Sequence, residues 1–389
     1  MINIKKSLFS IVAIVFLFQI IKYYSFYVEH SDWQYADWII NYQGGFIRRG
    51  LVGELLFRIH QITRIDLDFI VLSFVSSVVF FISYFLIRSI KYINESRINT
   101  LIFLSPGFFL YPMMNSAVVG QKDILIIFVM GFFAFFGKKF ESRNLFLLLI
   151  FFIFFLTLSH SGFLFYIPYL LFLYFLIKIN RNGKTRTFEV ATIIISLILI
   201  IILIIFNQGT ENQVKEICDS VKKFVSDRCG IFGQTYWLTN DYKDYLSEKA
   251  EIGINYSKYL TIYLISLILV YFFLIIKIIK SKFNINYFFL NKINPLFIFF
   301  FLFLFTLPTY IFGLDWGRYI FISYSCSFFI LIYCVKENLI SSNFDLKLTK
   351  FTFITVIIFY SFLWTFPFYN AENFKFTLKK PVLSLIKKF

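Results

Sequence analysis

The stretch "FEVATIIISLILIIILIIF", residues 188–206, indicates the class of fold. It is almost uninterrupted in its apolar character, and its length matches the roughly 20 residues that a helix needs to cross a bilayer core. Residues 258–276 and 295–312 repeat this pattern. A transmembrane β-barrel would instead show short segments of alternating character. The sequence therefore predicts an all-α, polytopic membrane helical bundle.

The composition of the whole chain supports this class. The 389 residues are 59% hydrophobic and only 15% charged, whereas soluble domains carry about 25% charged residues. Apolar runs along the chain predict about 11 transmembrane helices in a single integral membrane domain, residues 1–389. The spans expected are 8–28, 68–87, 99–114, 124–137, 145–159, 163–177, 188–206, 258–276, 295–312, 319–335 and 351–366.

The net charge of +16 raises the possibility of a nucleic-acid partner, but the distribution of the charge argues against it. Most of the excess lysine and arginine lies in alternate connecting segments, as the positive-inside rule requires of cytoplasmic loops. The N-terminus is then cytoplasmic, and the first span is expected to be a retained anchor. The basic tail, 375–389, either lies along the membrane surface or indicates that the number of predicted spans is wrong by one.

Two polar segments fall on the opposite, periplasmic side. They are a first loop, 29–67, and a larger loop, 207–257. Cys218 and Cys229 lie in the larger loop and are expected to form a disulfide in an oxidising compartment, with two free thiols as the alternative. Cys326 and Cys334 lie within a span and are expected to be inert.

Ionisable residues in a membrane protein are informative when they are not cytoplasmic anchors. Here they gather at the outer ends of spans, in four loops. This convergence predicts one outward-facing site assembled from several loops. Its candidate residues are Asp32, Asp37, Gly44, Gly45, Arg48, Arg49, Lys122, Asp123, His160, Asp315 and Arg318.

Each of these residues also has a structural interpretation. The aspartates could be solvated loop acids or caps, and His160 could be an ordinary turn residue. Asp315 and Arg318 are spaced to form an ion pair within one helix. Residues 51–62 place Leu51, Leu55, Ile59 and Ile62 on one face, which predicts an amphipathic helix lying in the membrane interface.

The residue types point to a lipid-linked substrate that carries phosphate. Arginine binds phosphate oxygens in two-point contact, and glycine lets the backbone approach an anionic head group. A carboxylate can serve as general base toward a sugar hydroxyl. We expect Asp37 or Asp32 to be that base, and His160 and Asp123 to orient the acceptor. Pyrophosphate would be bound through Gly44, Gly45, Arg48, Arg49, Lys122, Asp315 and Arg318.

A short first span, a first outer loop with an aspartate and an interfacial helix, and many further spans resemble the glycosyltransferase C superfamily. The topology and the Phe/Ile/Tyr-rich composition also resemble Wzy-type O-antigen polymerases. The resemblance implies a cell inner-membrane enzyme of lipopolysaccharide biosynthesis. Such an enzyme joins undecaprenyl-pyrophosphate-linked repeat units at the periplasmic face, with a catalytic carboxylate in the first outer loop. The larger loop follows the seventh span, earlier than in ligase-like members, which leaves the subgroup open.

The expected partners are an undecaprenyl-linked oligosaccharide, membrane lipids and a chain-length regulator protein, with no nucleic acid. No cofactor is required, although a divalent metal is compatible with the residues. One alternative is a side-branch glycosyltransferase that uses an undecaprenyl-phosphate sugar. A polysaccharide flippase or transporter is less favoured, because such proteins usually carry charges midway along their spans. A structural scaffold would leave the gathering of polar loops unexplained.

Overall fold

The computed structural model describes residues 4–93, 96–181, 183, 186–225, 227–231, 233–239, 256–284, 292–341 and 344–368. The predicted C-terminal tail lies outside these residues, as does most of the last third of the predicted loop 207–257. The regular secondary structure of the described residues is helical except for one small sheet, in which β1 (Lys282–Phe283) pairs antiparallel with β2 (Ile340–Ser341). The all-α class is therefore confirmed for the described residues.

The chain forms two compact units, each assembled from non-adjacent segments. The first comprises residues 1–18, 83–118 and 249–389, and the second comprises 19–82 and 119–248. The boundaries fall within α1 (Ile4–Val28) and α3 (Leu67–Ile93). The prediction of a single integral membrane domain stays a prediction. All of the polar loops discussed below, except the one that carries Asp315 and Arg318, belong to the second unit.

Eight helices of the described residues are long and apolar enough to cross a membrane. The chain is thus a multi-pass membrane protein by the length and composition of its helices. The predicted count of about 11 spans is not supported. The eight are α1, α3, α7 (Ser142–Ser159), η4 (Ser161–Tyr166) with α8 (Ile167–Asn180), α9 (Thr187–Phe206), α12 (Tyr256–Ile279), α14 (Pro295–Leu304) with α15 (Leu307–Phe312), and α16 (Trp316–Lys336).

Three predicted spans are not helices of spanning length. The run 99–114 contains α4 (Arg97–Phe103), a turn around Pro106, and α5 (Tyr111–Met114). Proline disfavours the helical conformation of the residue before it, so one continuous helix does not form here. The run 124–137 is α6 (Ile124–Phe136), whose 13 residues are mostly buried. Such a helix is about 20 Å long and behaves as a core helix. The run 351–366 is divided between α17 (Lys350–Ile357) and a π-helical turn, η6 (Ile358–Phe362).

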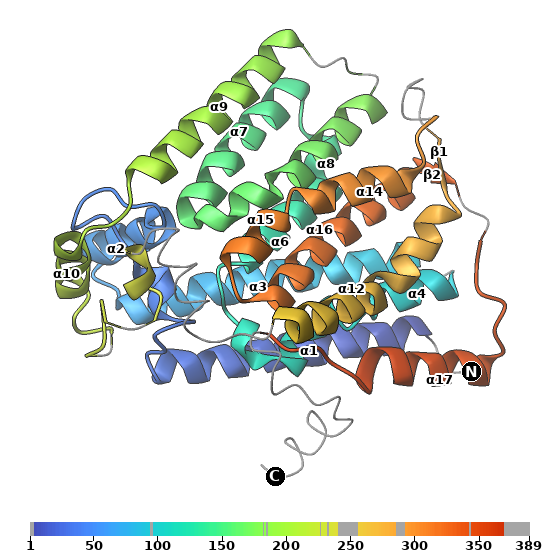
Figure 1. The fold of residues 1–389 in the computed structure, drawn as a ribbon, viewed down its shortest axis with the longest axis horizontal. Helices are drawn as coiled ribbons and strands as arrows, with labels where there is room; N and C mark the ends of the chain where they lie inside the picture. The colour runs from blue at the N-terminus through green and yellow to red at the C-terminus, as the bar shows by residue number, and fades with distance from the viewer. Residues whose placement is uncertain are drawn as a thin grey trace. The chain divides into compact units, whose positions relative to one another are not determined.

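In the second unit, α7 packs against α8 and α9, and α6 packs against α7 and α8 (Figure 1). The outer surface of α9 exposes a series of large apolar side chains, as expected for contact with lipid: Ile194, Ile195, Ile198, Leu199, Ile202 and Ile205. At its start, Glu189 forms a buried ion pair with Lys178 of α8 and accepts a hydrogen bond from the Tyr174 hydroxyl (3.3 Å). This pair joins the two helices of the hairpin. The short helices of the unit that lie in the polar loops are η1 (Ala36–Ile39), α2 (Leu51–Thr63), α10 (Glu211–Ser220) and η5 (Tyr236–Leu238), and η3 (Gly137–Lys139) follows α6.

The core of the first unit lies around α16, most of whose side chains are buried. The Tyr324 hydroxyl donates to the carbonyl oxygen of Ile102 in α4 (2.8 Å), and the Tyr271 hydroxyl of α12 donates to Ser323 (3.1 Å). These bonds satisfy polar groups inside an otherwise apolar bundle. The unit also contains the short η2 (Ser116–Val118).

The start of α4 is capped from a distant segment. Asp345 accepts hydrogen bonds from the backbone N–H groups of Arg97 (3.1 Å) and Ile98 (3.0 Å) and from the Ser96 hydroxyl (3.0 Å). Burial opposes ionisation of this carboxyl, but the hydrogen bonds outweigh burial and hold the pKa of Asp345 below its ordinary value. The carboxylate therefore fixes the 344–349 segment to α4.

This cap predicts a specific pH dependence. Because the folded pKa of Asp345 is depressed, its stabilising contribution is present above the ordinary aspartate pKa and is lost as the pH falls through the folded pKa. Asp345→Asn should lower the unfolding free energy at neutral pH by roughly 1–2 kcal/mol and flatten the acid limb of the melting curve. Thermal unfolding in detergent between neutral and acid pH measures both effects. Asp227→Asn, an exposed aspartate, is the control; equal acid limbs in wild type and Asp345→Asn would contradict the prediction.

Candidate functional site

The first polar loop is folded by its own backbone into a shape that buries Asp37. The backbone N–H groups of Tyr35 and Ala36 both donate to the carbonyl oxygen of Ser31 (3.1 and 3.0 Å), and Asp37 follows in η1. The indole N–H of Trp38 donates to the carbonyl oxygen of Gly120 (2.6 Å). This bond ties the first loop to the turn that precedes α6.

Gly120 makes this close approach possible. Its φ of +73° lies in the left-handed region, and a Cβ at this position would stand 1.9 Å from Cδ2 of Tyr23. Only glycine meets both conditions without strain. The next two residues of the turn, Gln121 and Lys122, are consequently held against the first loop.

Asp37 and Lys122 form a buried ion pair. The Lys122 Nζ lies 3.3 Å from Asp37 Oδ1 and donates a hydrogen bond to the carbonyl oxygen of Arg49 (3.0 Å). Lys122 is 0% exposed and Asp37 is 2% exposed. Burial lowers the pKa of Lys122, and the carboxylate of Asp37 partly offsets this effect. The structure thus brings together three residues that the sequence assigns to one site: Asp37, Arg49 and Lys122.

The two arginines are held by the disulfide-containing loop. Arg48 donates from Nη2 to the carbonyl oxygen of Trp237 (3.0 Å), and Arg49 donates from Nη1 to Oε1 of Gln234 (3.0 Å). Arg48 is 3% exposed. Both guanidinium groups therefore contact protein atoms of the 233–239 segment.

Several polar atoms around this cluster are buried but incompletely bonded. Among the described residues, Tyr23 Oη, Asp37 Oδ1 and Arg49 Nε are buried without a hydrogen-bond partner, although Asp37 keeps its ion pair with Lys122. Tyr23 interacts electrostatically with Asp37, and Arg49 with Lys122. Buried polar atoms are nearly always bonded in native proteins, so each exception calls for an explanation such as a bound polar ligand.

Asp32 has a different environment. Its carboxylate pairs with Arg228, and its carbonyl oxygen accepts the backbone N–H of Gln234 (3.1 Å). A Cβ at Gly233, whose φ is +78°, would lie 2.4 Å from the same carbonyl oxygen. Of the two aspartates that the sequence leaves open, Asp37 contacts the lysine–arginine cluster and Asp32 anchors the disulfide loop.

The Gly-Gly pair also serves packing. A Cβ on Gly44 would stand 2.3 Å from the carbonyl oxygen of Gln213 in α10, and Gly45 has a φ of +104°. The glycines that the sequence assigns to a phosphate cradle thus let the first loop reach α10. Behind them, an apolar cluster joins the same two segments: Ile40, Ile47, Val214, Ile217 and Leu238.

Cys218 and Cys229 form the predicted disulfide, with a Cα–Cα separation of 5.8 Å. The bond connects α10 to the segment that carries Arg228. α10 begins with a capping box, in which Thr210 and Gln213 bond to each other's backbone N–H groups. The free cysteines, Cys326 and Cys334, are buried in α16, where burial is compatible with the inert role expected for them.

The remaining predicted residues have local roles. His160 accepts the backbone N–H of Gly162 at Nδ1 (3.2 Å), which makes it the cap of η4. Asp123 is buried immediately before α6. In the first unit, Arg318 Nη1 lies 3.4 Å from Asp315 Oδ2, the ion pair within one helix that the spacing allows. The described residues contain no group of three His, Cys, Asp or Glu side chains that could hold a metal ion.

Sequence reasoning missed the partners that hold the site together. Arg228, Gln234 and Trp237 lie nearly 200 residues from the residues they bind, and no motif marks them. It also missed a cluster in which His30 Nε2 lies 3.3 Å from Asp68 Oδ2 while the Tyr35 hydroxyl donates to Asp68. Burial, followed by this hydrogen bond, raises the pKa of Tyr35.

Comparison of the chain with protein-family models, with curated proteins and with solved structures finds no match. The function must therefore be argued from the residues and their contacts.

Proposed function

We propose that the protein is an inner-membrane glycosyltransferase that acts at the periplasmic face on undecaprenyl-linked sugars, and that it polymerises polysaccharide repeat units. The observation that carries this proposal is the buried cluster of Asp37, Lys122 and Arg49. It combines a carboxylate, an ammonium and a guanidinium from two polar loops with two buried polar atoms that lack a hydrogen-bond partner, Tyr23 Oη and Arg49 Nε. These are the groups needed to accept a proton and to stabilise a departing pyrophosphate.

The proposed reaction is a displacement at the anomeric carbon. The acceptor hydroxyl oxygen forms a bond to this carbon, and its proton passes to the Asp37 carboxylate. The bond to the pyrophosphate oxygen breaks, and undecaprenyl pyrophosphate leaves with the electron pair. Arg48, Arg49 and Lys122 stabilise the charge that develops on the leaving group. Because Asp37 is buried, substrate entry requires a rearrangement of the loops around it.

Two further features support a periplasmic site. The disulfide of the larger loop suits an oxidising compartment, and the basic connecting segments suit the cytoplasm. Asp37, Arg49, Lys122 and the disulfide all belong to the same compact unit. The orientation with a cytoplasmic N-terminus accounts for both features at once.

We further propose that α2 lies in the membrane interface beside the site. It buries Val52, Leu56 and Phe57 against the protein. It exposes an apolar stripe of Leu55 (47%), Ile59 (45%) and Ile62 (81%). A helix with this pattern and a separate polar face binds at the boundary between head groups and acyl chains.

A nitroxide label tests the position of α2. The native cysteines are either disulfide-bonded or buried, so Ile62→Cys offers a single reactive thiol. In lipid nanodiscs, the label at this position should be more accessible to dissolved oxygen than to a water-soluble nickel chelate. Gln61→Cys, on the polar face of the same helix, should show the reverse preference. An equal ratio of oxygen to nickel-chelate accessibility at both positions would contradict the proposal that α2 lies in the membrane interface.

The glycan products test the function. In cells that carry this gene, its deletion should collapse the ladder of polysaccharide chain lengths to a single repeat unit, and the intact gene should restore the ladder. A loss of one sugar with unchanged chain length would favour the side-branch transferase. Loss of all glycan at the periplasmic face, together with accumulation of lipid-linked units on the cytoplasmic side, would favour a flippase.

A further inference from the structure

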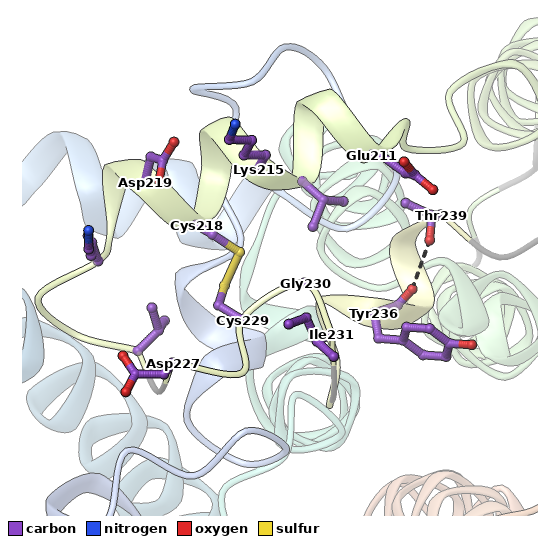
Figure 2. A pocket seen from close by; sticks show the side chains of 13 residues that line it. Glu211, Lys215, Cys218, Asp219, Asp227, Cys229, Gly230, Ile231, Tyr236 and Thr239 are labelled. Atoms are coloured by element: carbon purple, nitrogen blue, oxygen red, sulfur yellow. Dashed lines mark hydrogen bonds between the residues drawn. A yellow bond between two sulfur atoms is a disulfide. The ribbon is translucent and has the colours of Figure 1, made fainter.

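α10 and the segment that follows it enclose an open cavity of about 470 Å³. Figure 2 shows α10 on one side and the chain through Cys229, Gly230 and Ile231 on the other, with the disulfide joining the two sides. Ligand-binding cavities commonly measure 300–1,000 Å³. None of the residues that line this cavity belongs to the Asp37–Lys122 cluster, so it is a separate feature of the same unit.

The charges of the lining restrict what the cavity can bind. Glu211, Lys215 and Asp219 follow at intervals of four residues and so share one face of α10, and Lys222 and Asp227 complete the charged lining. A ligand that carries phosphate would meet three carboxylates. An apolar ligand would remove five charged groups from water at a high cost. The fitting ligand has many hydrogen-bond donors and acceptors and little net charge, as a sugar has.

The remaining lining residues suit a sugar ring. Tyr236 is 41% exposed and Ile231 is 74% exposed, so an aromatic and an aliphatic surface are available beside the charges. The Thr239 hydroxyl donates to the carbonyl oxygen of Tyr236 (3.1 Å) and fixes the turn that carries the ring (Figure 2). Tyrosine offers an apolar face together with a polar hydroxyl, which matches the C–H face and the hydroxyl edge of a pyranose.

We propose that this cavity binds the uncharged sugar portion of a glycan, and that it holds the acceptor chain while the Asp37 cluster acts on the lipid-linked donor. The role as acceptor site rests on the proposed function, whereas the binding of sugar does not. The alternative is a solvated helix face with ion pairs between successive turns. The cavity differs from such a face because the lining residues between 225 and 239, in a segment that the disulfide joins to α10, form a second wall.

Photo-crosslinking in growing cells tests the proposal with the natural ligand present. A p-benzoylphenylalanine residue in place of Tyr236 should, after irradiation, attach carbohydrate to the full-length protein. The adduct is detected by periodate oxidation and hydrazide labelling of the purified chain. The same photoreactive residue in place of Lys223, which is exposed in the same loop but does not line the cavity, should give at least tenfold less carbohydrate adduct.

A second variant links the adduct to the cavity. Glu211→Gln combined with Asp219→Asn should reduce the carbohydrate adduct at position 236 at least fivefold without changing the amount of protein. Asp37→Asn should leave the adduct intact, because it affects transfer and not acceptor binding.

Equal adducts at positions 236 and 223, an adduct with another protein alone, or no adduct would overturn the proposal. If the carbohydrate adduct forms but deletion of the gene leaves all glycans unchanged, the cavity binds sugar and the proposed function is wrong.

Discussion

Asp37→Asn is expected to lower the yield of polymerised glycan about 10²–10⁴-fold, the usual contribution of a general base. The substitution preserves the shape of the side chain but removes its ability to accept a proton. Lys122 would lose its counter-ion, and because burial lowers the pKa of Lys122, the effect of this loss on folding has to be measured separately. Glycan chain length on gels, at matched protein levels in the membrane, is the measurement.

Two further variants separate catalysis from folding. Asp37→Asn combined with Lys122→Met removes both charges of the buried pair. Because Lys122 is itself assigned to the leaving group, this double variant is compared with Asp37→Asn by melting temperature and not by activity. A double variant that melts at a higher temperature than Asp37→Asn would show that an uncompensated Lys122 destabilises the fold. A wild-type melting temperature in Asp37→Asn, together with loss of polymer, would assign the effect to catalysis. Glu29→Gln, an exposed acid in the same loop, should leave the ladder unchanged. Full-length polymer in Asp37→Asn would remove the base assignment.

The second large effect is expected in the α8–α9 hairpin. Glu189→Gln leaves Lys178, which is 3% exposed, without its charge partner in an apolar environment. Breaking one side of a buried ion pair typically costs about 3–5 kcal/mol. Because this is a large part of the stability of an ordinary domain, the variant should unfold at a markedly lower temperature in detergent.

The matched double variant decides the origin of this loss. Lys178→Met combined with Glu189→Gln removes both charges and keeps an oxygen that can accept the Tyr174 hydroxyl. It should recover most of the lost stability, since no unpaired charge then remains buried. Arg58→Met removes one partner of an exposed pair with Glu54 and should change the unfolding free energy by less than about 1 kcal/mol. A double variant as unstable as Glu189→Gln would assign the loss to packing instead.

Apolar runs predict the class of the fold well, because a helix that crosses the membrane needs about 20 apolar residues that are consecutive in the sequence. They fail where an apolar segment is buried by other parts of the protein instead of contacting lipid. α6 is as apolar as a span but has only 13 residues, since a helix enclosed by protein needs no fixed length. The predicted span 99–114 is wrong for a related reason. Hydropathy does not register the turn around Pro106, which the surrounding helices cover.

The candidate site was predictable in its residue types and only partly in its contacts. Charge and position at the outer ends of the predicted spans place Asp37, Arg49 and Lys122 among eleven candidate residues, and the structure brings these three together. Nothing in the spacing distinguishes Asp32 from Asp37. That choice depends on Arg228 and Gln234, which reach the first loop through a tertiary fold that no local pattern encodes.

The close packing of Gly44 on Gln213 has a consequence for protein engineering. The first loop and α10 approach each other with no space for a Cβ, and Asp32, Arg48 and Arg49 of the same loop bond to residues within 228–237, which follow α10. A chimaera that takes one of these loops from a related protein and keeps the other would therefore combine surfaces that do not fit each other. Specificity transplants should move residues 29–50 and 207–239 together, as a two-part cassette.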